Sequence, residues 1–178
     1  MTKMIRFLSL LIITFIISGF GMNIISAETD QASYAIIKGQ EVPEFELKLV
    51  DSAETLIQEK LLGRVYLLDF WMTRCKKCVD KMAFLHDIYE KYRDKDFTII
   101  SISADSSFEV VEAFRRGPWK MPWLHCLGVD GNNRQVMTAF EVNKLPKLVL
   151  VDREGKIVCT NYETDEAGFE KALEEMFK

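Results

Sequence analysis

The stretch FWMTRCKKC, residues 70–78, combines a pair of cysteines with three cations. Two residues separate Cys75 from Cys78, and Arg74, Lys76 and Lys77 surround them. A CxxC pair can be a redox-active dithiol, half of a zinc site, or two cysteines beside a basic surface. The elements on either side of the pair distinguish these alternatives.

The pair lies between an expected buried strand and an expected helix. The run RVYLLDFW is almost continuously apolar from Val65 to Trp71, which predicts a central strand that is covered on both faces. From Cys75 to Tyr92 apolar residues recur with a helical period. A helix start stabilises a thiolate, and a second thiol one turn later can resolve a mixed disulfide. We therefore predict that Cys75 attacks and Cys78 resolves.

A zinc site is disfavoured by the remaining ligands. It would need two more residues at a compatible spacing, and His86, His125, Cys126 and Cys159 form no second CxxC. We predict no metal and no bound cofactor, the redox-active disulfide being the reactive group. Cys126 and Cys159 are interpreted as small buried hydrophobes.

Asp69 interrupts the apolar strand six residues before Cys75. Burial would raise the pKa of its carboxyl and allow it to exchange protons with the cysteine pair. The alternative is a strand-end carboxylate in water. Its apolar neighbours in the sequence favour the buried position, so Asp69 is a candidate catalytic residue.

The rest of the chain alternates strands with helices, which predicts an α/β fold with a mostly parallel sheet. We expect a hairpin that includes residues 39–49 and turns at Asp51 and Ser52, a strand at 97–105, a helix capped by Ser106 or Ser107, a short strand at 123–126, a helix at 133–140, a strand after Pro146, a turn at 153–155, a strand through Val158, and a final helix from Thr164 or Asp165 to Phe177.

The N-terminus differs from the rest of the chain. Lys3 and Arg6 precede an uncharged apolar stretch at residues 7–25, which indicates an export signal ending near Ala27 or an uncleaved membrane anchor. We expect a linker at 28–38 and one domain at 39–178. The domain would then lie in the periplasm or on the outer face of the cytoplasmic membrane.

The charge balance argues against nucleic acid as a partner. The chain has 23 basic and 27 acidic residues; without residues 1–27 the basic count falls to 21 and the formal charge becomes −6.

Four segments, in order GQEVPEFEL, LLGRVYLLDFWMTRCKKC, FTIISISAD and FEVNKLPKLVLVDREGKIV, resemble the thioredoxin superfamily, and specifically its exported TlpA- and ResA-like thiol-disulfide oxidoreductases. The resemblance extends from about Gly39 to the C-terminus. It implies a thioredoxin-like fold: a central mixed sheet flanked by helices, with an N-terminal β-hairpin and an inserted helix-strand segment.

The resemblance also implies roles for single residues. Pro146 matches the cis-proline that faces the CxxC pair and helps to hold an extended substrate, with Leu145 and Trp71 beside the same site. Asp69 matches the buried acid of thioredoxin. The implied partners are protein thiol or disulfide substrates, for example apocytochrome c during maturation, and a membrane or periplasmic thiol electron donor. The protein is expected to be a reductant and a monomer.

The sequence departs from the family pattern around the cysteines. Arg74 stands where Trp is frequent, and Lys76 and Lys77 replace Gly-Pro or Glu-Pro. Lys81 and Ala83 stand where the branch usually has Glu and a helix-kinking Pro. Cations beside Cys75 should lower the pKa of its thiol and make the disulfide more oxidising, unless solvent screens them.

Two other functions stay open. Peroxiredoxins share the fold, but the Thr or Ser three residues before their reactive cysteine and the Pro seven before it are here Met72 and Leu68. A redox-sensing or partner-binding module without turnover is the alternative from another class. Thioredoxin strand order would place Cys126 and Cys159 at opposite edges of the sheet, too far apart for a disulfide.

Overall fold

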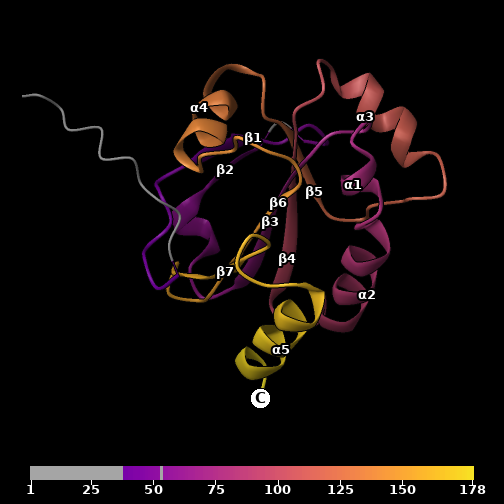
Figure 1. The fold of residues 1–178 in the computed structure, drawn as a ribbon. Coiled ribbons are helices and arrows are strands. Elements are labelled where there is room, and N and C mark those ends of the chain that lie inside the picture. The colour runs from indigo at the N-terminus through magenta and orange to yellow at the C-terminus, as the bar shows by residue number, and fades with distance from the viewer. Residues whose placement is uncertain (1–37, 53) are drawn as a thin grey trace, which may run out of the picture. The chain divides into compact units, whose positions relative to one another are not determined.

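The computed structural model describes residues 38–52 and 54–178 (Figure 1). The predicted leader at 1–27 and nearly all of the predicted linker at 28–38 lie outside these residues and stay predictions. In the described part of the chain, no helix has the length and apolar character to cross a membrane.

A five-stranded mixed sheet with the order β5-β4-β3-β6-β7 forms the centre of the fold. The strands are β1 Glu46–Lys48, β2 Thr55–Ile57, β3 Val65–Trp71, β4 Phe97–Ser103, β5 Leu124–Leu127, β6 Lys147–Val151 and β7 Ile157–Thr160. β4 runs parallel to β3 and β5, whereas β6 runs antiparallel to β3 and β7. The prediction that residues 65–71 form the central strand is confirmed, because β3 has two neighbours on each side.

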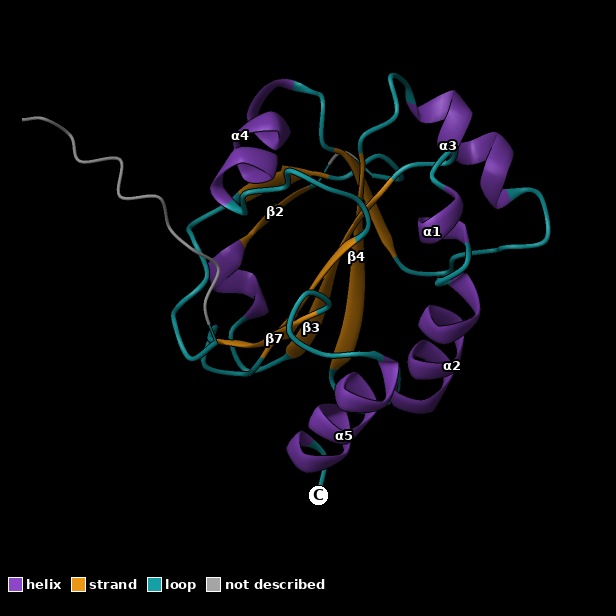
Figure 2. Cartoon of the chain, viewed as in Figure 1, coloured by secondary structure: helices purple, strands orange, loops and turns teal. Residues whose placement is uncertain are grey.

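The helices flank this sheet on both faces (Figure 2). They are the 3-10 helix η1 Gln58–Leu61 and the α-helices α1 Lys76–Val79, α2 Met82–Tyr92, α3 Phe108–Arg115, α4 Gly131–Ala139 and α5 Glu166–Met176. The sequence predicted one helix from the CxxC pair to Tyr92, but the structure divides it into α1 and α2. At the break the Lys81 N–H donates to the Cys78 carbonyl three residues back, at 3.1 Å, which tightens the turn.

Two apolar cores lie on opposite faces of the sheet. Alternate residues of β3 enter different cores: Leu67 and Trp71 pack with α2 and α5, whereas Leu68 and Phe70 pack with α4 and the β1 region. Figure 1 shows this division, with α1, α2 and α3 on one side of the strands and α4 with β1 and β2 on the other. β3 is buried along its whole length, as its continuous apolar sequence predicted.

β1 and β2 form a separate two-stranded antiparallel sheet, which confirms the predicted N-terminal hairpin. Cys126 lies on β5 and Cys159 on β7, the two edge strands, so the predicted placement at opposite edges is also confirmed. Both are buried free thiols in the described part of the chain.

Candidate active site

Cys75 and Cys78 form a disulfide at the start of α1, with their Cα atoms 5.2 Å apart. Cys75 is the N-cap residue, and its sulfur accepts a hydrogen bond from the Cys78 N–H at 3.2 Å. Cys78 is buried, whereas Cys75 is half-buried. The geometry therefore makes Cys75 the accessible sulfur and aims a backbone donor at it.

The loop before Cys75 is held by a buried carboxylate that the sequence did not single out. Asp105, which follows β4, accepts hydrogen bonds from the Thr73 N–H at 2.9 Å and the Thr73 hydroxyl at 2.8 Å. The Ser103 hydroxyl donates to the same carboxylate at 2.7 Å. Asp105 thus fixes the backbone two residues before Cys75. Thr73 and Asp105 are 32 residues apart, and no motif links them.

Pro146 and the cysteine helix border one pocket. The Leu145–Pro146 peptide bond is cis, as the resemblance implied. Leu145 and Pro146 line a pocket of about 390 Å³ together with Lys77, which lies between the two cysteines. Two segments that are far apart in the sequence, the Leu145–Pro146 segment and the helix that carries Cys78, therefore line one pocket.

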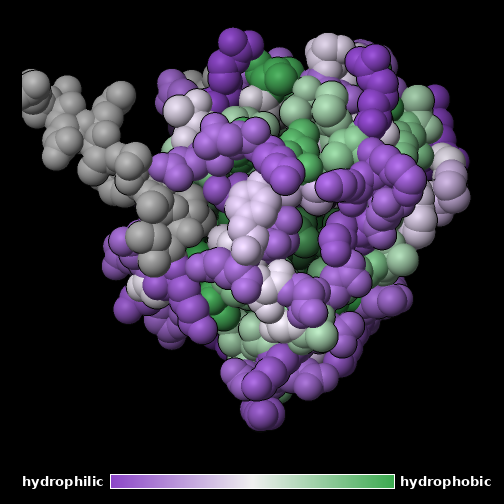
Figure 3. All heavy atoms as spheres, viewed as in Figure 1, coloured by the Kyte–Doolittle hydropathy of each residue, from purple (hydrophilic) through white to green (hydrophobic). Residues whose placement is uncertain are grey.

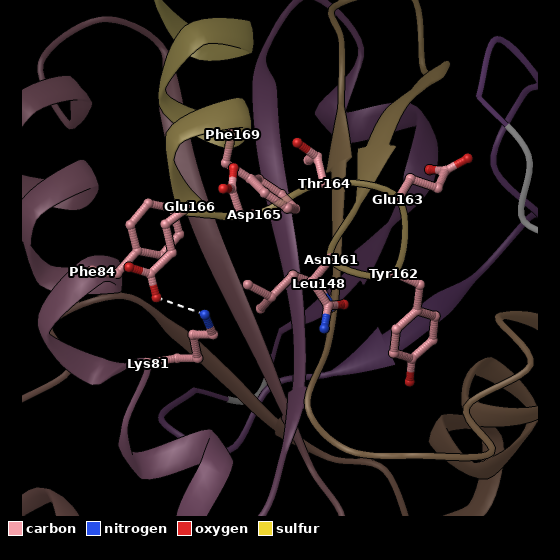
Figure 4. Close-up of a pocket in the computed structure, with 10 residues that line it drawn as sticks. All are labelled: Lys81, Phe84, Leu148, Asn161, Tyr162, Glu163, Thr164, Asp165, Glu166 and Phe169. Atoms are coloured by element: carbon pink, nitrogen blue, oxygen red, sulfur yellow. Dashed lines mark hydrogen bonds and ion pairs between the residues drawn. The ribbon is translucent and has the colours of Figure 1, made fainter.

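A second pocket of about 630 Å³ adjoins the first, because Lys81, Asn161 and Tyr162 line both. Figure 4 shows Lys81 reaching from the start of α2 to Glu166 at the start of α5. Their side chains form an ion pair at 2.6 Å. Asn161 donates to the Pro146 carbonyl at 3.0 Å and accepts from the Leu148 N–H at 2.7 Å, which holds the proline segment in place.

Asp69 is buried in the middle of β3, with 1% of its surface exposed. The alternation along β3 puts its side chain on the face of Leu67 and Trp71, the side whose core contains Cys78. Burial raises the pKa of Asp69 to about 7, although a hydrogen bond from the Ser101 hydroxyl at 2.7 Å favours the ionised form. A carboxyl with this pKa can take up and release a proton near neutral pH.

Trp71 is fully buried and packs against Phe114, with the ring centroids 5.2 Å apart. In this structure it supports the site from within the core; its contact with a substrate stays a prediction.

The three cations lie at the surface. Arg74, Lys76 and Lys77 are exposed, and Lys76 forms an ion pair with Asp80 at 2.8 Å. Asp80 partly neutralises Lys76, and solvent screens all three cations. Each of them therefore has only a modest electrostatic effect on a thiolate at Cys75. Their tuning of the Cys75 pKa stays a prediction.

Among the described residues, no group of three or more His, Cys, Asp or Glu side chains is arranged to hold a metal ion.

Known proteins share both the sequence pattern and the fold. A family described as thioredoxin-like matches residues 63–157. A thiol-disulfide oxidoreductase ResA of Bacillus cereus is 30% identical over 121 residues, which cover 67% of this chain and 66% of that protein. ResA of Bacillus subtilis (strain 168) is 26% identical over 124 residues, which cover 70% and 66%. The match thus spans slightly less than two thirds of these relatives.

Solved structures agree with this fold. The thioredoxin domain of a thiol-disulfide oxidoreductase from Bacteroides vulgatus superposes with a TM-score of 0.70 at 24% identity, covering 81% of this chain and 100% of that one. A thiol:disulfide interchange protein from Bacteroides sp. gives a TM-score of 0.68 at 24% identity, covering 80% and 91%. With its matched residues, sheet order and cysteine pair, the chain belongs to the thioredoxin-like family.

Proposed function

We propose that the protein is an exported thiol-disulfide oxidoreductase that exchanges disulfides with protein substrates through Cys75 and Cys78. The observation that carries this proposal is the disulfide at the start of α1, with the accessible sulfur on Cys75; α1 also lines a pocket with the Leu145–Pro146 segment. The names of the curated relatives support the same reaction class.

In the reductive direction, the Cys75 thiolate attacks one sulfur of a substrate disulfide. A Cys75–substrate disulfide forms, and the other substrate sulfur leaves as a thiolate that takes a proton. The Cys78 thiolate then attacks the Cys75 sulfur, so that the intramolecular disulfide forms and the second substrate thiol leaves. Two electrons pass from the cysteine pair to the substrate, and each substrate sulfur gains one proton.

Asp69 serves the second step as proton acceptor. Cys78 is buried and must lose its proton before it attacks, and a carboxyl with a pKa of about 7 can accept this proton. Asp69 then returns the proton to the departing thiolate or to solvent.

We propose reduction as the working direction, with exported thiol proteins such as apocytochrome c as substrates and a membrane or periplasmic thiol protein as electron donor. The resemblance to the exported branch and the N-terminal apolar stretch support this assignment. The exposed large hydrophobic residues in the described part of the chain, Leu62, Val110 and Tyr162, lie on separate segments. Hydrophilic side chains cover most of the face in Figure 3. Both observations support a monomer.

The test is reduction of insulin disulfides by the full chain with dithiothreitol as electron source. Cys75→Ser removes the attacking sulfur and should abolish the catalysed rate. Cys159→Ser is the matched control, because it removes a buried thiol at the far edge of the sheet, and it should keep the wild-type rate.

Full activity of Cys75→Ser would contradict the assignment. A stable redox-dependent complex with a partner and negligible insulin reduction by the wild type would favour the sensing module instead. Consumption of peroxide with an added thiol, lost in Cys75→Ser, would favour a peroxidase.

A further inference from the structure

A chain of two buried hydrogen bonds ends on Asp69. The Trp123 indole N–H donates to the Ser101 hydroxyl oxygen at 2.8 Å. The Ser101 hydroxyl donates to Oδ2 of Asp69 at 2.7 Å. Trp123, Ser101 and Asp69 are 5%, 0% and 1% exposed, so water has little access to any of the three groups.

The chain has a favoured direction. An indole N–H can only donate, and a serine hydroxyl has one proton to give. With the Trp123 N–H on its oxygen, Ser101 directs its proton to Asp69, the one acceptor recorded for this hydroxyl among the described residues. Oδ2 of Asp69 is therefore an acceptor, and an exchangeable proton on this carboxyl belongs on Oδ1.

Trp123 is buried between side chains of α2 and β5. His86 and Tyr89 of α2 contact its ring with centroid distances of 5.1 and 5.3 Å, and His125 stacks on it at 6.3 Å. The Tyr89 hydroxyl also donates to the Pro122 carbonyl at 2.8 Å. This packing orients the indole so that its N–H donates to Ser101.

Among the described residues, the bond from Ser101 is the one side-chain hydrogen bond recorded for Asp69, and the neighbouring elements contribute mainly apolar or neutral groups. On β5, His125 lies opposite Ser101, and burial lowers the pKa of its imidazole to about 4, so it is neutral at pH 7. Arg115 of α3 acts electrostatically on His125. β6 presents Leu148 opposite Asp69, and α5 adds Phe169 to the same core. In the part of the chain that the structure describes, the other titratable groups on this side include Cys75 and Cys78 at α1, His86, Tyr89 and Tyr92 on α2, and Cys159 on β7.

We propose that Ser101 and Trp123 are positioning residues for Asp69, which keep Oδ2 as an acceptor and so stabilise the ionised carboxylate that takes the proton of Cys78. The role in exchange rests on the proposed function, whereas the effect on the carboxyl does not. Ser101→Ala removes the donor. Trp123→Phe removes the indole N–H and frees the Ser101 oxygen to accept a proton from a protonated Asp69. Both changes therefore favour the protonated acid.

The test is a titration of the Asp69 side-chain carboxyl by carbon-13 NMR in the oxidised full chain, with Asp69→Asn to assign the signal. Ser101→Ala should raise the pKa of Asp69 by about one unit, since a hydrogen bond to a charged group is being removed. Trp123→Phe should raise it in the same direction by less. Trp119→Phe is the matched control. Trp119 also packs against His86 but makes no recorded hydrogen bond to Ser101, so the titration midpoint of Asp69 in this variant should stay at the wild-type value.

Ser101→Thr keeps the hydroxyl and should restore the wild-type midpoint. An unchanged midpoint in Ser101→Ala would overturn the proposal, and an unchanged midpoint in a folded Trp123→Phe would overturn the role of Trp123. If Trp123→Phe does not fold, the comparison of Ser101→Ala with Ser101→Thr tests the proposal, because Ser101→Ala removes a single heavy atom. These readouts use no enzymatic activity, so a failure of the proposed exchange reaction is seen separately in the insulin assay. If exchange does occur, the pH optimum of insulin reduction should move upward with the Asp69 midpoint.

Discussion

At the scale of single residues, the burial of Asp69 carries an electrostatic cost. A carboxylate inside an apolar core is destabilised relative to water, and one hydrogen bond from Ser101 offsets only part of this cost. The fold itself does not require a carboxyl at this position, since an apolar or amide residue would avoid the cost. The proposed role of Asp69 in proton transfer accounts for a carboxyl at this position of β3.

The pH dependence of stability tests the burial of Asp69. Its pKa rises from 3.8 in the unfolded chain to about 7 in the folded protein, so its stabilising contribution is complete below about pH 4 and is lost as the pH rises to 7. The loss amounts to about 4 kcal/mol, at roughly 1.4 kcal/mol per unit. The free energy of unfolding of oxidised wild type and Asp69→Asn is measured with urea at pH 4 and at pH 8. Between these pH values, the stability of the variant relative to wild type should rise by this amount. An equal difference at the two pH values would mean that the carboxyl is not buried.

The exposed cations should tune the reduction potential slightly. A cation near Cys75 stabilises its thiolate and hence the reduced form, so Arg74→Ala and Lys77→Ala should make the potential more negative by up to about 20 mV. Lys76→Ala should have the smallest effect, because Asp80 already pairs with Lys76. Equilibration with glutathione at low and at 1 M salt measures this, and the differences should vanish at high salt. Differences that persist at 1 M salt would point to a cause other than exposed charge.

The sequence predicted the reactive residues better than their supports. Cys75, Cys78 and Asp69 stand out because each breaks or marks a pattern along the chain, whereas Pro146 was predicted only from the resemblance. Asp105 and Ser101 could not be found in this way: each acts through a hydrogen bond to a residue 32 positions away. Such a bond depends on the register between β3 and β4, which pattern alone does not give.

At the scale of elements, the break between α1 and α2 separates the cysteine helix from the packing helix. Helical periodicity predicted one continuous helix, because the apolar spacing continues through the break. At the interruption lie one local hydrogen bond and the Lys81–Glu166 ion pair to α5, and neither leaves a signature in the apolar pattern.

A proline scan of α2 tests this break. Ala83 is exposed and is the second residue of α2, where N–H groups have no acceptor within the helix. Ala83→Pro should therefore change the free energy of unfolding by less than about 1 kcal/mol. Asp87→Pro, at an exposed site in the middle of the same helix, should cost about 3 kcal/mol or more. Urea unfolding compares the two; equal large losses would mean that the helix is continuous through residues 79–83.

At the scale of the whole molecule, the order of strands brings the site together. β3 is central, so the cysteine pair that follows it lies beside β4, which leads to Asp105, and β6, which follows Pro146. The alternation of strands and helices predicted an α/β fold, and the resemblance to thioredoxin supplied the order of the strands. The same strand order predicted the edge positions of Cys126 and Cys159. Both are buried, as is Cys78, so Cys75 is the one half-buried cysteine among the four.

Trapping of the mixed disulfide tests the central claim, that Cys75 attacks and Cys78 resolves. The reduced full-length Cys78→Ser variant is mixed with oxidised insulin, and the adduct is located by peptide mass spectrometry. We expect a stable adduct on Cys75 that wild type does not accumulate, because wild type resolves it. An adduct on Cys126 or Cys159, or equal adduct formation by the Cys75→Ser, Cys78→Ser double variant, would contradict this assignment of the two cysteines.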